Sequence, residues 1–173
     1  MTHPEVEHAV ALYNQGYTCT QSILASFAAR YGIQQGLAFR LGEPFGAGTS
    51  CTNDMCGSVT GAIMVLGLQY GSASSDDLAA RSYTYRCIHE LIRRFKDVHG
   101  SIQCTGLLGY DLSDPQQLQT VWEKGLFVQL CPTLVRDAAQ IVAEMIAMPI
   151  PTSIERSSTS AARGDGITNS TLE

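Results

Sequence analysis

The most apolar stretch of the chain reads Met55-Cys56-Gly57-Ser58-Val59-Thr60-Gly61-Ala62-Ile63-Met64-Val65-Leu66-Gly67-Leu68-Gln69-Tyr70. Apolar side chains occur on nearly every side of a helix built from this stretch, which is typical of a helix buried at the centre of a bundle. Its sixteen residues are fewer than the ~20 that a membrane-spanning helix needs. We therefore predict a central buried helix and no membrane span.

Helical patterns lie on both sides of this stretch, and no segment of any strength has the two-residue period of a strand. A loop with three glycines and a proline, Gly42 to Ser50, precedes the central helix. The longest helix has a predicted inward stripe of Leu78, Ser82, Tyr85, Ile88, Ile92 and Phe95. Beside the central helix we predict helices over Pro4 to Gln15, Cys19 to Tyr31, Leu37 to Leu41, Asp76 to Val98, Asp114 to Gly125 and Pro132 to Met148. The sequence predicts an all-α, single-domain helical bundle.

The chain is long enough for one domain with its own core, since it has 173 residues of which 45% are hydrophobic. We assign residues 1–150 to a helical four-cysteine redox domain. From Thr152 onward Ser, Thr, Gly and Asn dominate, so residues 151–173 are predicted to form a weakly packed or disordered tail.

The charge of the chain disfavours some partners. A net charge of -5 argues against nucleic acid or an anionic membrane as a general partner. The tightest basic cluster, Arg93, Arg94 and Lys96, is interpreted as a solvated helix face. The N-terminus lacks the pattern of a secretory signal, which favours a cytoplasmic location. In a reducing cytoplasm, cysteines are expected to be ligands, redox groups or core residues rather than permanent bridges.

Cysteines occur where the local sequence predicts the start of a helix. Thr18 followed by Gln21 is a capping-box pattern, which places Cys19 in a first helical turn. Asp54 is a suitable cap for the apolar stretch, so Cys56 is predicted in a first turn as well. Backbone N-H groups at a helix N-terminus favour the thiolate over the thiol. Thiolates are the form that binds metal or exchanges disulfides.

Two more cysteines show the same pattern. Cys131 immediately precedes Pro132, a residue favoured at the first helical position, so this thiol is predicted at a helix entrance. Cys104 is expected to begin a brief helical turn. The chain contains no C-x-x-C pair, so local spacing indicates neither a zinc ribbon nor a thioredoxin site. Ligands from separate helices can still converge at one end of a bundle, and we predict that these four cysteines do so.

Gly57 and Gly61 lie four residues apart in the central helix. They place a flat strip on one helix face, where another backbone or a cofactor could come close. We therefore treat both glycines as candidate cofactor-binding positions.

Four segments of the chain resemble one family of redox-active proteins, named for its own cysteine pattern, C_GCAxxG_C_C. The resemblance covers roughly Gly16 to Ala147 and implies that Cys19, Cys56, Cys104 and Cys131 act together. The domain is also similar to part of the split-Soret cytochromes, which implies an iron-sulfur cluster. Haem is not implied, because the chain has no C-x-x-C-H site. The segments are Gly16-Tyr17-Thr18-Cys19-Thr20-Gln21-Ser22, Cys56-Gly57-Ser58-Val59-Thr60-Gly61-Ala62, Gly100-Ser101-Ile102-Gln103-Cys104 and Cys131-Pro132-Thr133-Leu134-Val135-Arg136-Asp137-Ala138-Ala139.

The chain departs from the family pattern in three places. Ser58 stands where the family usually has alanine. Cys51 is an additional cysteine that could be a resolving thiol, an alternative ligand or a structural residue. Cys87, also additional, is interpreted as an inert buried residue. None of the histidines, His3, His8, His89 and His99, is assigned as a ligand.

Three functions therefore remain open. The four cysteines, as metal ligands, could hold an iron-sulfur cluster for electron transfer or redox sensing. In a metal-free thiol-disulfide oxidoreductase, Cys56 would be the catalytic nucleophile and another cysteine would resolve it. In a structural or interaction module, the four cysteines would hold zinc. A redox partner protein is expected for the first function, and self-association is possible for each. Whether the chain is an enzyme stays open.

Overall fold

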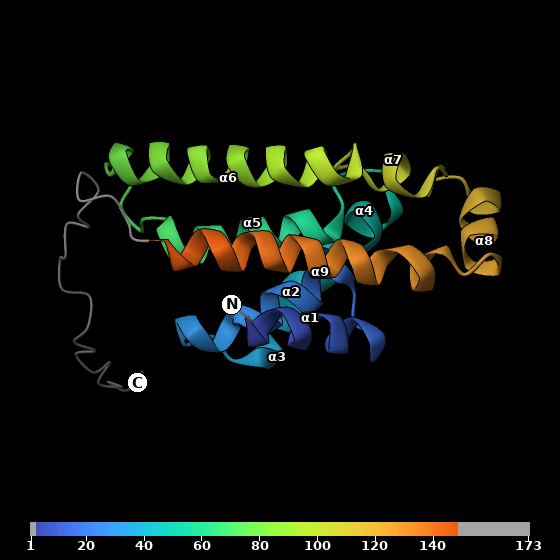
Figure 1. The fold of residues 1–173 in the computed structure, drawn as a ribbon, viewed down its shortest axis with the longest axis horizontal. Helices are drawn as coiled ribbons and strands as arrows, with labels where there is room; N and C mark the ends of the chain where they lie inside the picture. Colours follow the sequence, from blue (N-terminus) through green and yellow to red (C-terminus); the bar gives the residue numbers. More distant parts are fainter. Residues whose placement is uncertain (1–2, 149–173) are drawn as a thin grey trace, which may run out of the picture.

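The computed structural model describes residues 3–148, so the predicted tail lies outside the described residues. The fold has three layers (Figure 1). Helices α5 (Gly57–Tyr70) and α9 (Leu126–Ala147) lie side by side in the middle layer. Helix α6 (Leu78–His99) covers one side, and α1 (Pro4–Asn14) and α2 (Cys19–Ala28) cover the other.

Shorter elements complete the bundle. They are η1 (Ala29–Tyr31), α3 (Gln35–Gly42), η2 (Glu43–Phe45), α4 (Gly46–Cys51), α7 (Cys104–Leu108) and α8 (Pro115–Glu123). Of these, α4, α7 and α8 lie toward the right-hand end in Figure 1, where the chain returns to α9. Within residues 3–148 no strand is present apart from an isolated bridge between Met55 and Gln103. The predicted all-α fold is confirmed.

Helix α5 is the central buried helix that its composition predicts. Val59, Ala62, Val65 and Leu66 are completely buried. A Cβ atom built on Gly61 would lie 3.1 Å from Ile23 Cβ of α2. The small residue is therefore needed for the close packing of α5 against α2.

Helix α6 matches the predicted stripe only in its second half, where Phe95 is buried and Ile88 and Ile92 pack against the core. Its buried residues are Ala80, Thr84, Leu91 and Phe95, whereas Leu78 and Tyr85 are exposed. The helix begins later than predicted because the Asp77 side chain accepts the Ala80 N-H, 2.9 Å away, and so forms the cap.

Helix α9 begins earlier than predicted, which corrects the position of Cys131. Gly125 adopts a φ of 64° and precedes the helix, and Leu126 is its first residue. Pro132 therefore lies inside the helix, and Cys131 is not at a helix entrance. The prediction gave too much weight to the preference of proline for the first turn, because a proline further inside costs one backbone hydrogen bond that tertiary packing can offset.

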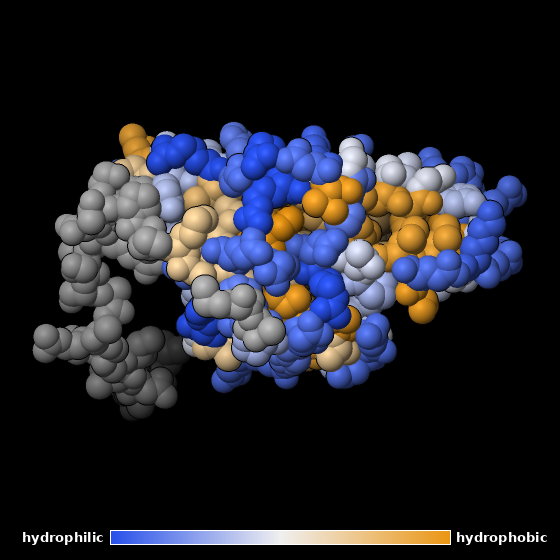
Figure 2. Space-filling view, viewed as in Figure 1, coloured by the Kyte–Doolittle hydropathy of each residue, from blue (hydrophilic) through white to orange (hydrophobic). Residues whose placement is uncertain are grey.

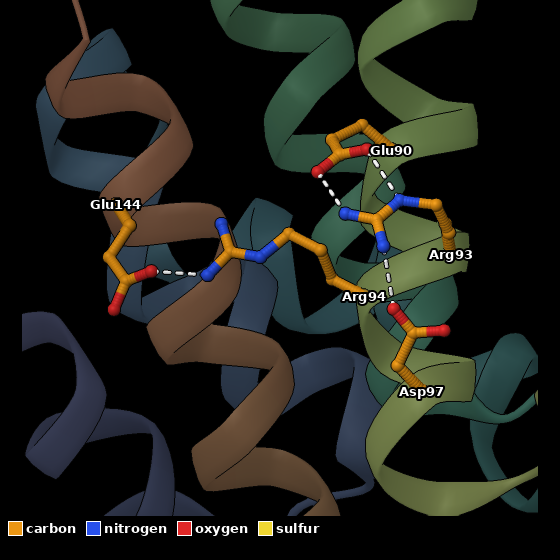
Figure 3. Close-up of polar contacts among 5 residues, drawn as sticks. All are labelled: Glu90, Arg93, Arg94, Asp97 and Glu144. Atoms are coloured by element: carbon orange, nitrogen blue, oxygen red, sulfur yellow. Dashed lines mark hydrogen bonds and ion pairs between the residues drawn. The ribbon is translucent and has the colours of Figure 1, made fainter.

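Charged side chains form ion pairs at the surface, both between helices and within one helix. Arg94 of α6 pairs with Glu144 of α9, while Arg93 pairs with Glu90 and Asp97 along α6 itself (Figure 3). The basic cluster predicted from the sequence is thus largely neutralised by acidic neighbours. Exposed pairs of this kind contribute little stability each.

Helix α9 is the one helix among the described residues that is long and apolar enough to cross a membrane by length and composition. It packs against α1, α5 and α6, and its buried face includes Val135, Ala138 and Val142. The core helix of a bundle meets the same criteria.

Candidate redox site

Cys56 and Cys104 are brought together by backbone hydrogen bonds between two loops. The Cys56 N-H donates to the Ile102 carbonyl at 2.7 Å, and the Cys104 N-H donates to the Asp54 carbonyl at 3.1 Å. The isolated bridge between Met55 and Gln103 lies between these two bonds. This short antiparallel pairing joins chain segments almost fifty residues apart in sequence and places the two thiols within hydrogen-bonding contact.

Cys56 is the N-cap of α5 rather than a first-turn residue as predicted. Its carbonyl accepts the Thr60 N-H at 3.0 Å, which is the first hydrogen bond of the helix, and Gly57 is the first helical residue. The Asp54 carboxylate accepts the Met55 N-H instead of capping the helix. The Cys56 thiol is 1% exposed and lies beside the free N-H groups of the first turn.

Cys19 and Cys131 form a second pair, held by helices. Cys19 is the first residue of α2, and the predicted capping box between Thr18 and Gln21 is confirmed. Cys131 comes from the second turn of α9. The two thiols are buried and share a hydrogen bond.

The two pairs belong to one site. The charge of Cys56 acts on Cys19, Cys104 and Cys131, and the charge of Cys131 acts on Cys104. Cys104 begins α7, as expected. The structure thus brings all four cysteines of the family pattern together from α2, α5, α7 and α9.

Each pair combines one thiol whose pKa is lowered with one whose pKa is raised. The hydrogen bond from Cys104 is the largest influence on Cys56; together with the N-H groups of Ser58 and Val59 it outweighs burial and lowers the Cys56 pKa to about 7. The buried Ser58 hydroxyl, which has no other partner among the described residues, acts in the same direction. The Cys104 pKa is raised by the same hydrogen bond and by burial.

The second pair is polarised in the same way. The hydrogen bond from Cys19 lowers the Cys131 pKa despite burial, and the Tyr13 hydroxyl adds to this effect. The Cys19 pKa is raised by that hydrogen bond and by burial. The Tyr13 hydroxyl also lies 3.0 Å from the Phe127 carbonyl, so its single proton is donated either to that carbonyl or to Cys131. Sequence patterns gave no signal for Tyr13, because a single tyrosine near the end of a helix is ordinary.

The turn before the site has the opposite hand to a normal helix. The residues of α4 from Ala47 to Ser50 have φ between 49° and 67°, and Cys51 and Asn53 are also positive. Left-handed backbone costs roughly 1–2 kcal/mol per non-glycine residue. Such strain persists only where the surroundings fix it and is concentrated at functional sites. The glycines and proline indicated a loop, but nothing in the sequence indicated this conformation.

Two glycines leave room for the cysteines. A Cβ atom on Gly48 would lie 2.7 Å from Cys104 Cβ, and one on Gly57 would lie 3.2 Å from Cys19 Cβ and 2.6 Å from Thr20 Oγ1. Gly61 instead faces Thr20 and Ile23 of α2. That Gly57 and Gly61 admit a cofactor stays a prediction.

The additional cysteines differ in position. Half-buried Cys51 ends the left-handed turn, and its charge acts on Cys104. Cys87 is half-buried on α6, where its neighbours include Tyr83 and Arg86 and burial raises its pKa. Cys87 is not among the influences on any of the four paired thiols.

No three His, Cys, Asp or Glu side chains within residues 3–148 are grouped so as to hold a metal ion. Zinc in a structural site is bound by four donors around one ion, with Zn-S distances near 2.3 Å. The thiols here are hydrogen-bonded as two pairs. The absence of a ready-made metal group among these residues applies to zinc and to an iron-sulfur cluster alike.

A pocket of about 370 Å³ opens beside the thiols. Cys19, Cys104 and Cys131 form part of its wall, whereas Cys56 does not reach it. Most of the remaining wall is aromatic or apolar, from Tyr13, Tyr17, Ala47, Trp122, Phe127 and Val128.

The fold and the site define a helical protein with a buried four-cysteine centre. The family described as "Putative redox-active protein (C_GCAxxG_C_C)" matches residues 17–145, and the chain belongs to this family of redox-active proteins. The match includes all four paired cysteines. No curated protein and no solved structure matches the chain.

Proposed function

We propose that Cys19, Cys56, Cys104 and Cys131 hold an iron-sulfur cluster and that the protein transfers electrons or senses redox state through it. The observation that carries this proposal is the arrangement of the four thiols as two close pairs at one buried site. A two-iron cluster has four cysteine ligands, two on each iron. One pair would serve one iron and the second pair the other.

The charge of the site also favours a bound cation. Each pair stabilises one thiolate, at Cys56 and at Cys131, and burial of unpaired negative charge is costly. No lysine, arginine or histidine within residues 3–148 is among the largest influences on the pKa values of these thiols. Iron would supply the missing positive charge, and the cluster would supply one-electron chemistry.

The residues around the thiols would tune this centre. The N-H groups of Ser58 and Val59 and the Ser58 hydroxyl lie at Cys56, and hydrogen bonds to cluster sulfurs are among the factors that set a reduction potential. Tyr13 would act similarly at Cys131. The redox partner protein and any self-association remain expectations.

A metal-free thiol-disulfide oxidoreductase is the second candidate. It is favoured by the pocket, which reaches a stabilised thiolate at Cys131 and its neighbour Cys19. The Cys131 thiolate would attack a substrate disulfide and release one substrate thiolate. Cys19, after losing its proton, would then attack the mixed disulfide and release the second thiolate, leaving a Cys19-Cys131 disulfide. In this alternative Cys131 replaces Cys56 as the nucleophile, because Cys131 lines the pocket and the buried Cys56 does not.

Anaerobic purification followed by iron and sulfide analysis tests the proposal. We expect about two irons and two sulfides per chain, with visible absorbance that disappears in the variants Cys56→Ser and Cys131→Ser. Cys87→Ser is the matched control and should keep the iron. A colourless protein whose four thiols oxidise to two disulfides would favour the second candidate. A protein with neither property would overturn both.

A further inference from the structure

The pocket beside Cys19, Cys104 and Cys131 has the size and the wall of a small-molecule site. Its volume of about 370 Å³ lies within the range of about 300–1,000 Å³ that is usual for ligand pockets. Such pockets combine apolar and aromatic walls with a few polar groups. Here the polar residues of the wall include Asn14 and Thr18, whose side chains can hydrogen-bond a ligand oxygen.

The wall selects for a flat and neutral ligand. Four aromatic side chains contribute to it, Tyr13, Tyr17, Trp122 and Phe127, and aromatic rings pack well against other ring systems. Among residues 3–148, no lysine, arginine, histidine, aspartate or glutamate lines the pocket, and the thiolate favoured at Cys131 repels negative charge. An anionic ligand would therefore lose its hydration without gaining a partner.

The position of the pocket indicates a redox compound. Three of the four paired cysteines are part of its wall, so a bound ring would lie next to the four-cysteine site. Hydrophobic surface gathers at the same end of the molecule, around α8 and the start of α9 (Figure 2). Trp122 and Val128 there are 65% and 73% exposed, which leaves the entrance open to solvent.

We propose that this pocket binds a neutral aromatic redox compound of the quinone class. A quinone is flat and uncharged, and it has carbonyl oxygens that the Asn14 amide can meet. Nucleotide cofactors are disfavoured because their phosphates would have no cationic partner in the pocket. Electron transfer, in which the reduced cluster would be oxidised and the quinone reduced by one electron, rests on the proposed function, whereas binding itself does not.

Tryptophan fluorescence can measure this binding directly, because Trp122 is the only tryptophan of the chain. The probe is 2,3-dimethyl-1,4-naphthoquinone, whose substituted ring does not readily add thiols. It is titrated into the full chain in its metal-free, reduced form. We expect saturable quenching of Trp122. Isothermal titration calorimetry should give the same dissociation constant.

A matched pair of variants makes the test specific. Val128→Glu places a charge at the pocket wall and should weaken binding roughly tenfold or more. Val98→Glu is the control, since Val98 is similarly exposed, at 65%, on α6 and is not part of the pocket wall. It should bind like the original chain. If Val128→Glu is less helical by circular dichroism, Val128→Gln replaces it, with a smaller loss of affinity expected.

Quenching that does not saturate, or equal affinities for Val128→Glu and Val98→Glu, would overturn the quinone site. Because the measurement uses metal-free protein, its failure is distinct from failure of the iron-sulfur proposal. Saturable binding with the expected loss in Val128→Glu would support the site even if purified protein contained no iron.

Discussion

The helix-held pair, Cys19 and Cys131, and the loop-held pair, Cys56 and Cys104, present the same chemistry on different supports. The first pair depends on a capped helix start and on the core face of α9. The second depends on two backbone hydrogen bonds between loops, with the left-handed turn packed against them. Regular helices tolerate substitution better than a strained turn whose conformation each neighbour helps to fix. We therefore expect the loop-held pair to be the more fragile.

The largest effect should come from Gly48→Val. Gly48 has a φ of +67°, and a Cβ atom there would lie 2.7 Å from Cys104 Cβ and 3.0 Å from the Asp54 carbonyl. Backbone strain and the clash together should lower the free energy of unfolding by about 3 kcal/mol. Urea denaturation measures this loss. Gly67→Ala is the control, because nothing lies within 4 Å of its new Cβ and alanine favours a helix by about 1 kcal/mol. Equal stability of the two variants would show that the turn is not constrained.

A pH series tests whether the pKa of Cys56, in the loop-held pair, is lowered by the fold. Cys56 has a pKa of about 7 in the fold against 9.0 ordinarily, so the folded state binds fewer protons than the unfolded chain between these values. In metal-free, reduced protein, the free energy of unfolding should rise from pH 7 to pH 9 by up to about 2 kcal/mol. Above pH 9 it should fall, because the raised pKa values of Cys19 and Cys104 let the unfolded chain ionise first.

Cys104→Ala sharpens this test, because it removes the largest cause of the low Cys56 pKa. Ultraviolet absorbance of the thiolate should then titrate at a higher pH, and the rise in stability between pH 7 and pH 9 should shrink. A variant that keeps Cys56 as its only cysteine would miss this effect. An unchanged titration in Cys104→Ala would show that backbone N-H groups alone stabilise the Cys56 thiolate.

The sequence predicted the local elements of both pairs better than the contacts that bring them together. The capping box at Thr18 and the apolar stretch of α5 are local patterns, and both are confirmed. The bridge between Met55 and Gln103 and the left-handed turn depend on contacts between distant segments, which no local pattern records. The start of α9 was wrong because Pro132 resembled a first-turn proline. Convergence of the four cysteines was predicted from their placement at helix starts and from the family resemblance, because their spacing alone gives no such signal.

The helix-held pair should respond mildly to loss of its cap. Thr18→Ala removes the hydroxyl that accepts the Gln21 N-H at 3.3 Å, while Gln21 Oε1 still accepts the Thr18 N-H. The free energy of unfolding should fall by about 1 kcal/mol, as measured by urea denaturation. Thr18→Ser keeps the acceptor and should lose less. Of the four paired cysteines, α2 holds only Cys19, so the thiolate titration of Cys56 should not change. A shift in that titration would mean that the helix-held and loop-held pairs are coupled.

The smallest effect is expected for Cys87→Ala, which lies outside both pairs. Cys87 is only half-buried on α6, and burial is the main reason that its pKa is raised. Removal of one partly buried sulfur should cost about 0.5 kcal/mol by urea denaturation, with the iron content of anaerobically purified protein unchanged. Cys51→Ala is the informative counterpart, since Cys51 ends the left-handed turn and its charge acts on Cys104. Iron lost from Cys87→Ala but retained in Cys51→Ala would reverse our assignment of the two additional cysteines.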